Sequence, residues 1–172
     1  MPLSGLPNFD PRRIPVDRID TDLPAVGRER LQPDALQQRF ANPPRWHPEV
    51  VVEKKFTDRQ PAHASVLVPV IMRAQPTVLL TERTAHLSTH SGQIAFPGGK
   101  VDDTDADAAA TALRETHEEV GLDERSIEVI GTLPIYVTGS AFIITPVVAL
   151  VQPGFVLHPN PDEVADAFEV PL

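Results

Sequence analysis

Short apolar runs of strand length, separated by turn residues, recur along most of this chain. Residues 64–71 and 77–81 are rich in valine, leucine and isoleucine, and Ala74-Gln75-Pro76 lies between them. Runs of this kind bounded by turn residues are typical of strands, so the pair predicts a β-hairpin. Further strands are predicted at residues 50–52, 94–96, 127–133, 135–138 and 142–150.

Three segments carry helix signals instead. Residues 31–42 contain Pro33 near their start and stop before Pro43-Pro44, and residues 105–120 are followed by Gly121. Pro161-Asp162-Glu163 has the proline and acids of a first helical turn, so it predicts a last helix. The order of strands, one central helix, more strands and a last helix predicts a mixed α/β layer structure.

The central predicted helix carries acids on one face. At about 100° per residue, Glu115, Glu118 and Glu119 fall within a sector about 100° wide. Like charges at this spacing repel, and the C-terminal half of a helix disfavours anions. A Mg²⁺ or Mn²⁺ ion held by carboxylate oxygens would relieve both costs, and a solvated acidic face is the alternative. The opposite face consists of Ala109, Leu113, Thr116 and Val120. This narrow apolar stripe indicates that the face packs on a sheet.

Composition narrows the class of protein. The 172 residues include 15 Lys and Arg, 24 Asp and Glu and no cysteine, giving a formal net charge of −9. A disulfide framework and a thiol nucleophile are therefore excluded, and the broad basic surface of a non-specific nucleic-acid binder is not expected. A helix that spans a membrane needs about 20 apolar residues, and no apolar run in this chain approaches that length. The first residues of the chain do not resemble a secretory signal. We expect a cytoplasmic protein that binds neither nucleic acid nor membrane.

Prolines mark the organisation of the chain. There are 19 of them, and the first 30 residues mix proline with aspartate and arginine without clear periodicity. We therefore predict an N-terminal extension over residues 1–30 and one domain over residues 31–172.

A glycine-rich turn precedes the acidic helix. Phe96-Pro97-Gly98-Gly99 lets the backbone approach a metal or phosphate closely. Fifteen residues after Gly99 comes Arg114-Glu115-Thr116-His117-Glu118-Glu119-Val120-Gly121-Leu122. Together they resemble the Nudix box, in which a glycine, a first acid and an Arg-Glu-apolar-x-Glu-Glu-x-Gly segment follow at fixed spacing. This chain has one extra residue before Arg114, so that Asp105 or a neighbour stands for the first acid, and Thr116 replaces an apolar residue.

The segment before that turn extends the resemblance. Leu79-Leu80-Thr81-Glu82-Arg83, His86-Leu87, His90 and Gly92 look like the signature of the coenzyme A pyrophosphatase branch of the Nudix hydrolases. Ser88 stands where that branch usually has a basic residue. The resemblance implies a Nudix fold, which is an α/β/α sandwich with a mixed sheet and a central catalytic helix.

The same resemblance implies an activity. It implies hydrolysis of the diphosphate of coenzyme A or a derivative to 3′,5′-ADP and 4′-phosphopantetheine, with Mg²⁺ or Mn²⁺ as the cofactor. The alternatives are a broader hydrolase acting on ADP-ribose or dinucleotides, and a nucleotide sensor without turnover. The family is often dimeric, which leaves a homodimer open.

The resemblance also implies roles for side chains. Glu115 and Glu119 would be the principal metal ligands, Glu118 a further ligand or the base, and Arg114 an orienting cation. The Gly99 carbonyl and Glu163 are further candidate ligands.

Cations and histidines near the turn are candidates for binding the phosphates of a small nucleotide substrate, namely Arg83, His86, His90 and Lys100. For Phe40 and Trp46, burial in the core is expected ahead of stacking on an adenine.

Overall fold

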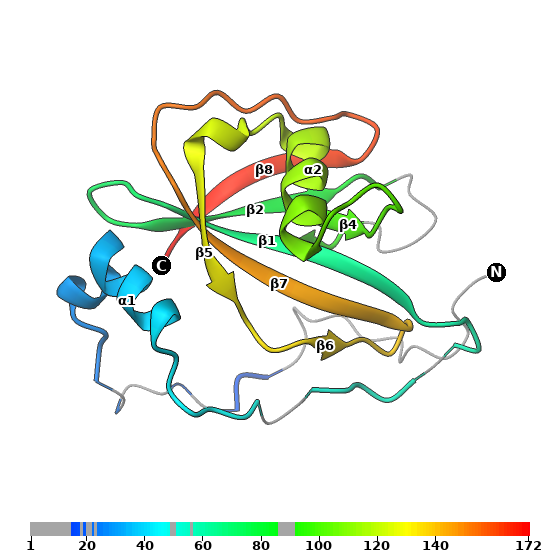
Figure 1. The fold of residues 1–172 in the computed structure, drawn as a ribbon, viewed down its shortest axis with the longest axis horizontal. Coiled ribbons are helices and arrows are strands. Elements are labelled where there is room, and N and C mark those ends of the chain that lie inside the picture. Colours follow the sequence, from blue (N-terminus) through cyan, green and yellow to red (C-terminus); the bar gives the residue numbers. More distant parts are fainter. Residues whose placement is uncertain are drawn as a thin grey trace.

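The fold is that of a computed structural model, which describes residues 15–17, 19, 22, 24–48, 51–55, 57–85 and 92–172. Figure 1 shows a twisted sheet with helices packed on it. The helical elements are η2 (Arg28–Leu31), α1 (Pro33–Ala41), α2 (Ala108–Val120) and η3 (Glu124–Ser126). The strands are β1 (Ala62–Ile71), β2 (Thr77–Arg83), β3 (Ile94–Ala95), β4 (Gly98–Lys100), β5 (Ile127–Thr132), β6 (Tyr136–Val137), β7 (Phe142–Val151) and β8 (Val164–Pro171).

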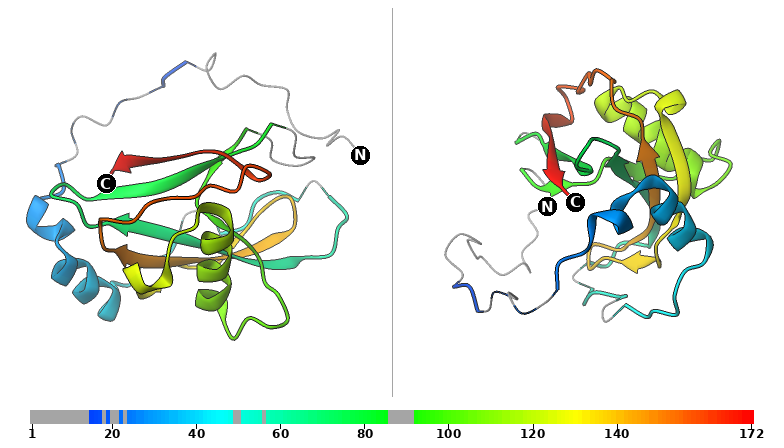
Figure 2. Two further views of the ribbon diagram at one scale, coloured as in Figure 1. Left: turned by 90° about the horizontal axis from the view of Figure 1, so that it is seen from above. Right: turned by 90° about the vertical axis from the view of Figure 1, so that its left-hand side faces the viewer.

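Strand β1 organises the sheet. It pairs in parallel with β7 along its whole length, from Ala62 opposite Phe142 to Ile71 opposite Val151. Its other edge is shared, because its last residues pair with β2 and residues 64–66 pair with β4. Strand β2 diverges from β1 and pairs with β3 and β8 (Figures 1 and 2). This divergence makes room for β4 beside the start of β1.

The two faces of the sheet are covered by different helices. On β7, Val147 and Ala149 belong to the cluster that packs against α2, whereas Val148 and Leu150 belong to the cluster that packs against α1. Successive side chains of a strand point to opposite faces, so α1 and α2 lie on opposite sides of the sheet. The predicted layered α/β architecture is confirmed.

Most predicted elements are present with small shifts of their ends. The hairpin before residue 84 and the strands over residues 127–151 form as expected. The central helix begins at Ala108 rather than at residue 105 and ends at Gly121, whose φ of 69° is the left-handed conformation that favours glycine at this position.

The prediction of a last helix is wrong. Residues 161–163 form a turn, and residues 164–171 form strand β8, which pairs antiparallel with β2. The proline and acids do mark a turn, but the residues that follow pair with the free edge of β2 and form a further strand. The second helical layer of the sandwich is α1, whose Leu36 and Phe40 pack on Val70.

Two further expectations concern the chain as a whole. No helix among the described residues has the length and apolar character that crossing a bilayer requires. The division into residues 1–30 and 31–172 stays a prediction.

Candidate active site

The loop before α2 and the helix caps place the acidic face. The Asp107 carboxylate accepts a hydrogen bond of 2.9 Å from the Ala110 amide and caps the N-terminus of α2. In the loop just before it, Asp105 accepts hydrogen bonds of 2.9 Å from the Asp102 amide and from the Thr111 hydroxyl. The position of the Asp105 carboxylate is therefore set by its own loop and by the first turns of the helix.

Arg114 is the centre of an ion-pair network. Its Nε and Nη2 donate to both oxygens of Asp105, at 3.0 and 2.9 Å, and its Nη1 donates to Glu115 at 3.0 Å and to Glu118 at 3.2 Å. Nη2 also donates to the Lys100 carbonyl at 3.0 Å. The Arg114 guanidinium holds the pKa of Asp105 well below its usual range. Asp105 is thus the acid that supports Arg114, in spite of the extra residue in the loop.

Glu119 is a buried carboxylate, with 3% of the residue exposed. Its Oε2 accepts a hydrogen bond of 3.1 Å from the Gly98 amide, and its Oε1 lies 3.5 Å from Nη1 of Arg83. Burial raises the pKa of Glu119 to about 7, although the Gly98 amide and the Arg83 charge act in the opposite direction. Ionising Glu119 in the folded protein therefore costs free energy, and a further positive charge nearby would reduce this cost.

Gly98 and Gly99 were expected in a turn, but they are the first two residues of strand β4 and pair with Val66 and Ser65. Glu115 approaches them from α2. A Cβ at residue 99 would overlap the Glu115 carboxylate, so a side chain there would displace this carboxylate from its place beside Gly99. Burial raises the pKa of Glu115, against the lowering effect of Arg114. The two carboxylates of α2 thus meet Gly98 and Gly99 side by side.

Glu163 lies in the turn before β8. Its charge acts to raise the pKa of both Glu115 and Glu119. Glu118 lies at the outer edge, with 54% of its side chain exposed, and is paired with Arg114. The acidic cluster therefore consists of Glu115 and Glu119 beside Gly98 and Gly99, with Glu118 joined to Glu115 through Arg114.

The donor set fits an oxygen-preferring divalent cation such as Mg²⁺ or Mn²⁺. It consists of carboxylates and backbone carbonyls, and burial raises the pKa of Glu115 and Glu119, so a nearby cation would favour their charged forms. Within the described chain, no three His, Asp or Glu side chains are already grouped as a formed metal site.

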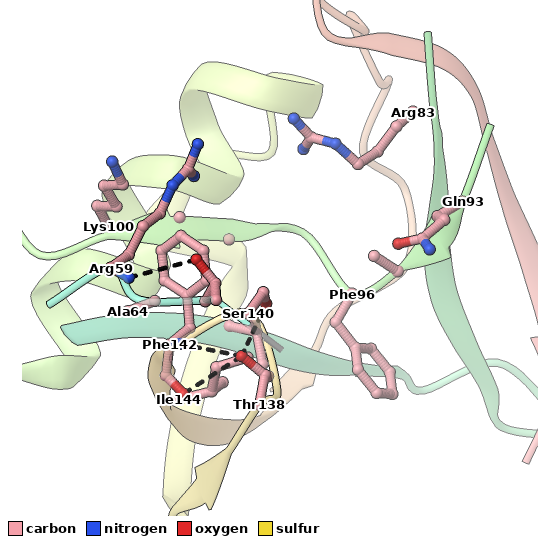
Figure 3. A pocket seen from close by; sticks show the side chains of 15 residues that line it. Arg59, Ala64, Arg83, Gln93, Phe96, Lys100, Thr138, Ser140, Phe142 and Ile144 are labelled. Carbon is pink, nitrogen blue, oxygen red and sulfur yellow. Dashed lines mark hydrogen bonds between the residues drawn. The ribbon is translucent and has the colours of Figure 1, made fainter. Parts of the chain in front are cut away.

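A cavity of about 480 Å³ borders Gly98 and Gly99 (Figure 3). Its floor includes Val66, Phe142 and Ile144, which alternate along β1 and β7 with the residues that face α2. The cavity therefore opens on the sheet face opposite α2 and meets the acidic cluster at β4. Among the described residues that line it, the charged ones are all cations, namely Arg59, Arg83 and Lys100.

The chain matches the NUDIX domain family model over residues 61–172. This chain belongs to the Nudix family. The match spans the whole sheet, α2 and the acidic cluster, and it begins just before β1.

Relatives with this fold come from several organisms. An uncharacterized Nudix hydrolase NudL of Photorhabdus laumondii is 47% identical over 119 residues, which make up 69% of this chain and 63% of that protein. The chain thus spans less than two thirds of that relative's length. A Nudix hydrolase from M. smegmatis, RenU, is 25% identical with a TM-score of 0.51, covering 66% of this chain and 71% of that one. An Ap4A hydrolase of C. elegans is 22% identical with a TM-score of 0.53, over 64% and 80% of the two chains.

The remaining predicted residues have different outcomes in this Nudix domain. His86 and His90 lie outside the described residues. Phe40 packs against the core beneath α1, as expected. The expectation that Trp46 is buried is wrong, because 60% of it is exposed. It follows Pro43-Pro44 at the end of α1, where the chain runs along the surface instead of turning into the core.

Sequence reasoning missed several lining residues of the cavity. Arg59 lies outside the Nudix match, Ser140 lies in the turn before β7, and Phe142 is the first residue of β7. They reach Gly98 and Gly99 only through the parallel pairing of β1 with β7, which joins residues 80 apart, such as Ala64 and Ile144. No local pattern in the sequence signals this convergence.

Proposed function

We propose that this Nudix domain hydrolyses a diphosphate linked to a nucleoside, and that its substrate is coenzyme A or a derivative. The products would be 3′,5′-ADP and 4′-phosphopantetheine. The observation that carries the proposal is the meeting of Glu115 and Glu119 with Gly98 and Gly99 at the border of a cation-lined cavity. The diphosphate would lie at these glycines and the nucleoside would occupy the cavity.

The residues that would hold Mg²⁺ or Mn²⁺ are Glu115 and Glu119, with Glu118, Glu163 and the Gly99 carbonyl as further ligands. Such an ion neutralises charge on diphosphate oxygens and makes water a stronger nucleophile at neutral pH.

Arg114 has a positioning role in this proposal. Its bidentate pairing with Asp105 fixes the guanidinium, which in turn holds Glu115 and Glu118 at 3.0 and 3.2 Å. A carboxylate fixed in this way loses less conformational freedom when substrate and cation bind. Glu118 is the exposed member of the pair, so it can accept a proton from an attacking water.

A turnover screen tests the proposal. The chain would be incubated with Mg²⁺ or Mn²⁺ and coenzyme A, dephospho-coenzyme A, ADP-ribose or a diadenosine polyphosphate, and the products identified by mass spectrometry. We expect coenzyme A to be cleaved, and Glu119→Gln to lower kcat on the order of 100-fold, because the amide removes a charged oxygen ligand. Glu124→Gln, which changes an exposed acid after α2, is the matched control.

Each other outcome points to a different function. Brisk cleavage of ADP-ribose or a diadenosine compound without cleavage of coenzyme A would assign the broader hydrolase. Nucleotide binding without any turnover would assign a sensor and would overturn the proposed catalytic role of the glutamates.

A further inference from the structure

We propose that Arg59 and Lys100 bind a second phosphate group of the substrate, a phosphomonoester on the nucleoside, separate from the diphosphate. This inference rests on the proposed function, because it names a feature of the substrate that the same site would take. Neither the family match nor the sequence motif points to Arg59.

The lining of the cavity is cationic. Its described residues include three cations and neither Asp nor Glu, although the chain has a net charge of −9. Arg83 is engaged with Glu119 at 3.5 Å. Across the described residues, the ion pairs found leave the side chains of Arg59 and Lys100 without a carboxylate partner. Two cations are therefore available to an anionic ligand.

The Lys100 side chain is directed towards the cavity floor. Its Nζ lies 5.9 Å from the centroid of the Phe142 ring, on the cavity floor. Glu115 meets Gly99, the preceding residue of β4, from the α2 side. Because neighbouring residues of a strand point to opposite faces, the ammonium group and the carboxylate lie on different sides of β4. The anion that Lys100 binds is thus distinct from the diphosphate at the acidic cluster.

Figure 3 shows Arg59 and Lys100 extending side by side over the cavity, with Arg83 approaching from the other side. A guanidinium can bond two phosphate oxygens at once, and an ammonium group adds a compact positive charge. A phosphomonoester carries close to two negative charges near neutral pH, so two adjacent cations match it in charge.

The segment before Arg59 is held in place by Glu53. The Glu53 amide donates to the Val137 carbonyl at 2.8 Å, and its carboxylate accepts hydrogen bonds from the Tyr136 hydroxyl at 2.6 Å and from the Gly139 amide at 2.7 Å. These bonds attach the segment to β6 and to the turn beside the cavity.

Calorimetric titration of the full chain with adenosine 3′,5′-bisphosphate and with 5′-AMP tests the inference. Both probes carry the 5′-phosphate, and they differ only in the 3′-phosphomonoester. We expect the unchanged protein to bind the bisphosphate about tenfold more tightly than AMP. Arg59→Gln and Lys100→Gln should each remove most of this preference and leave the Kd for AMP within about twofold. Lys54→Gln, on the same segment but outside the cavity lining, should change neither Kd.

Two results would overturn the inference. Equal affinity of the unchanged protein for the two probes would show that no second phosphate is bound. Equal weakening of both probes by the variants would show that Arg59 and Lys100 contact the 5′-phosphate instead. The titration uses one expected product and its analogue and needs no turnover, so a failure to cleave any diphosphate would overturn the proposed function while leaving this measurement valid.

Discussion

At the scale of single residues, acids of one short region differ because their surroundings differ. Asp105 is paired with Arg114 through both oxygens, which lowers its pKa, whereas burial raises the pKa of Glu119. The spacing of the sequence predicted that Glu118 and Glu119 share a helix face. It could not predict that one is half exposed and the other buried, because that depends on β4 and Arg83 covering part of the face.

The raised pKa of Glu119 predicts a pH-dependent stability in the absence of divalent cations. The pKa is about 7 in the fold and 4.5 as its usual value, so the folded state holds this proton more tightly. The stabilisation is fully present below pH 4.5 and is lost as the pH rises through about 7. Glu119→Gln stays neutral, so we expect it to be more stable than the unchanged protein at pH 8 by roughly 1 to 3 kcal/mol, with no difference near pH 4.5.

Urea unfolding in a chelator at several pH values measures this difference. Glu118→Gln, one residue away with an exposed side chain, is the control and should not gain stability at pH 8. An identical pH dependence for Glu119→Gln and the unchanged protein would contradict the burial of a proton-binding carboxylate at this position.

At the scale of elements, local sequence signals predicted the structure correctly where the neighbouring parts of the chain favour the same conformation. Gly121 ends α2 as expected, and the turn before residue 77 forms the hairpin of β1 and β2. The last element differs because the capping signal at residues 161–163 describes only a turn. Whether the following residues become helix or strand depends on the edge of β2, which lies about 80 residues earlier in the chain.

The cap of α2 gives a prediction at this scale. Asp107→Ala removes the oxygen that accepts from the Ala110 amide, so we expect a loss of about 1 kcal/mol of unfolding free energy and a Tm lower by about 2 to 4 °C. Asp107→Ser keeps an acceptor at the cap and should restore most of the loss. Thermal unfolding compares the two, with Asp103→Ala in the preceding exposed loop as the control. Equal effects of Ala and Ser would show that the cap contributes nothing.

At the scale of the whole molecule, the sheet separates a group of acidic side chains from a cavity lined by cations. The acidic cluster lies on the α2 face and the cationic cavity opens on the other, and both meet at Gly98 and Gly99 of β4. The sequence predicted the acids from their spacing within one helix. The cavity could not be predicted, because Arg59, Arg83 and Phe142 come from three parts of the chain that only the completed sheet brings together.

The acidic cluster predicts that divalent cations stabilise the whole fold. A ligand that binds only the folded state raises the free energy of unfolding, by about 2.7 kcal/mol at a concentration 100 times its Kd. We therefore expect Mg²⁺ or Mn²⁺ to raise the Tm of the unchanged protein and a chelator to reverse the rise. The double variant Glu115→Gln/Glu119→Gln should have a Tm that no longer responds to the ion, because two charged oxygens beside Gly98 and Gly99 are gone. Glu124→Gln should respond as the unchanged protein does, since its exposed carboxylate in η3 is not part of the cluster. A rise in Tm of the same size in the double variant would mean that the ion binds elsewhere, and the assignment of Glu115 and Glu119 as ligands would fail.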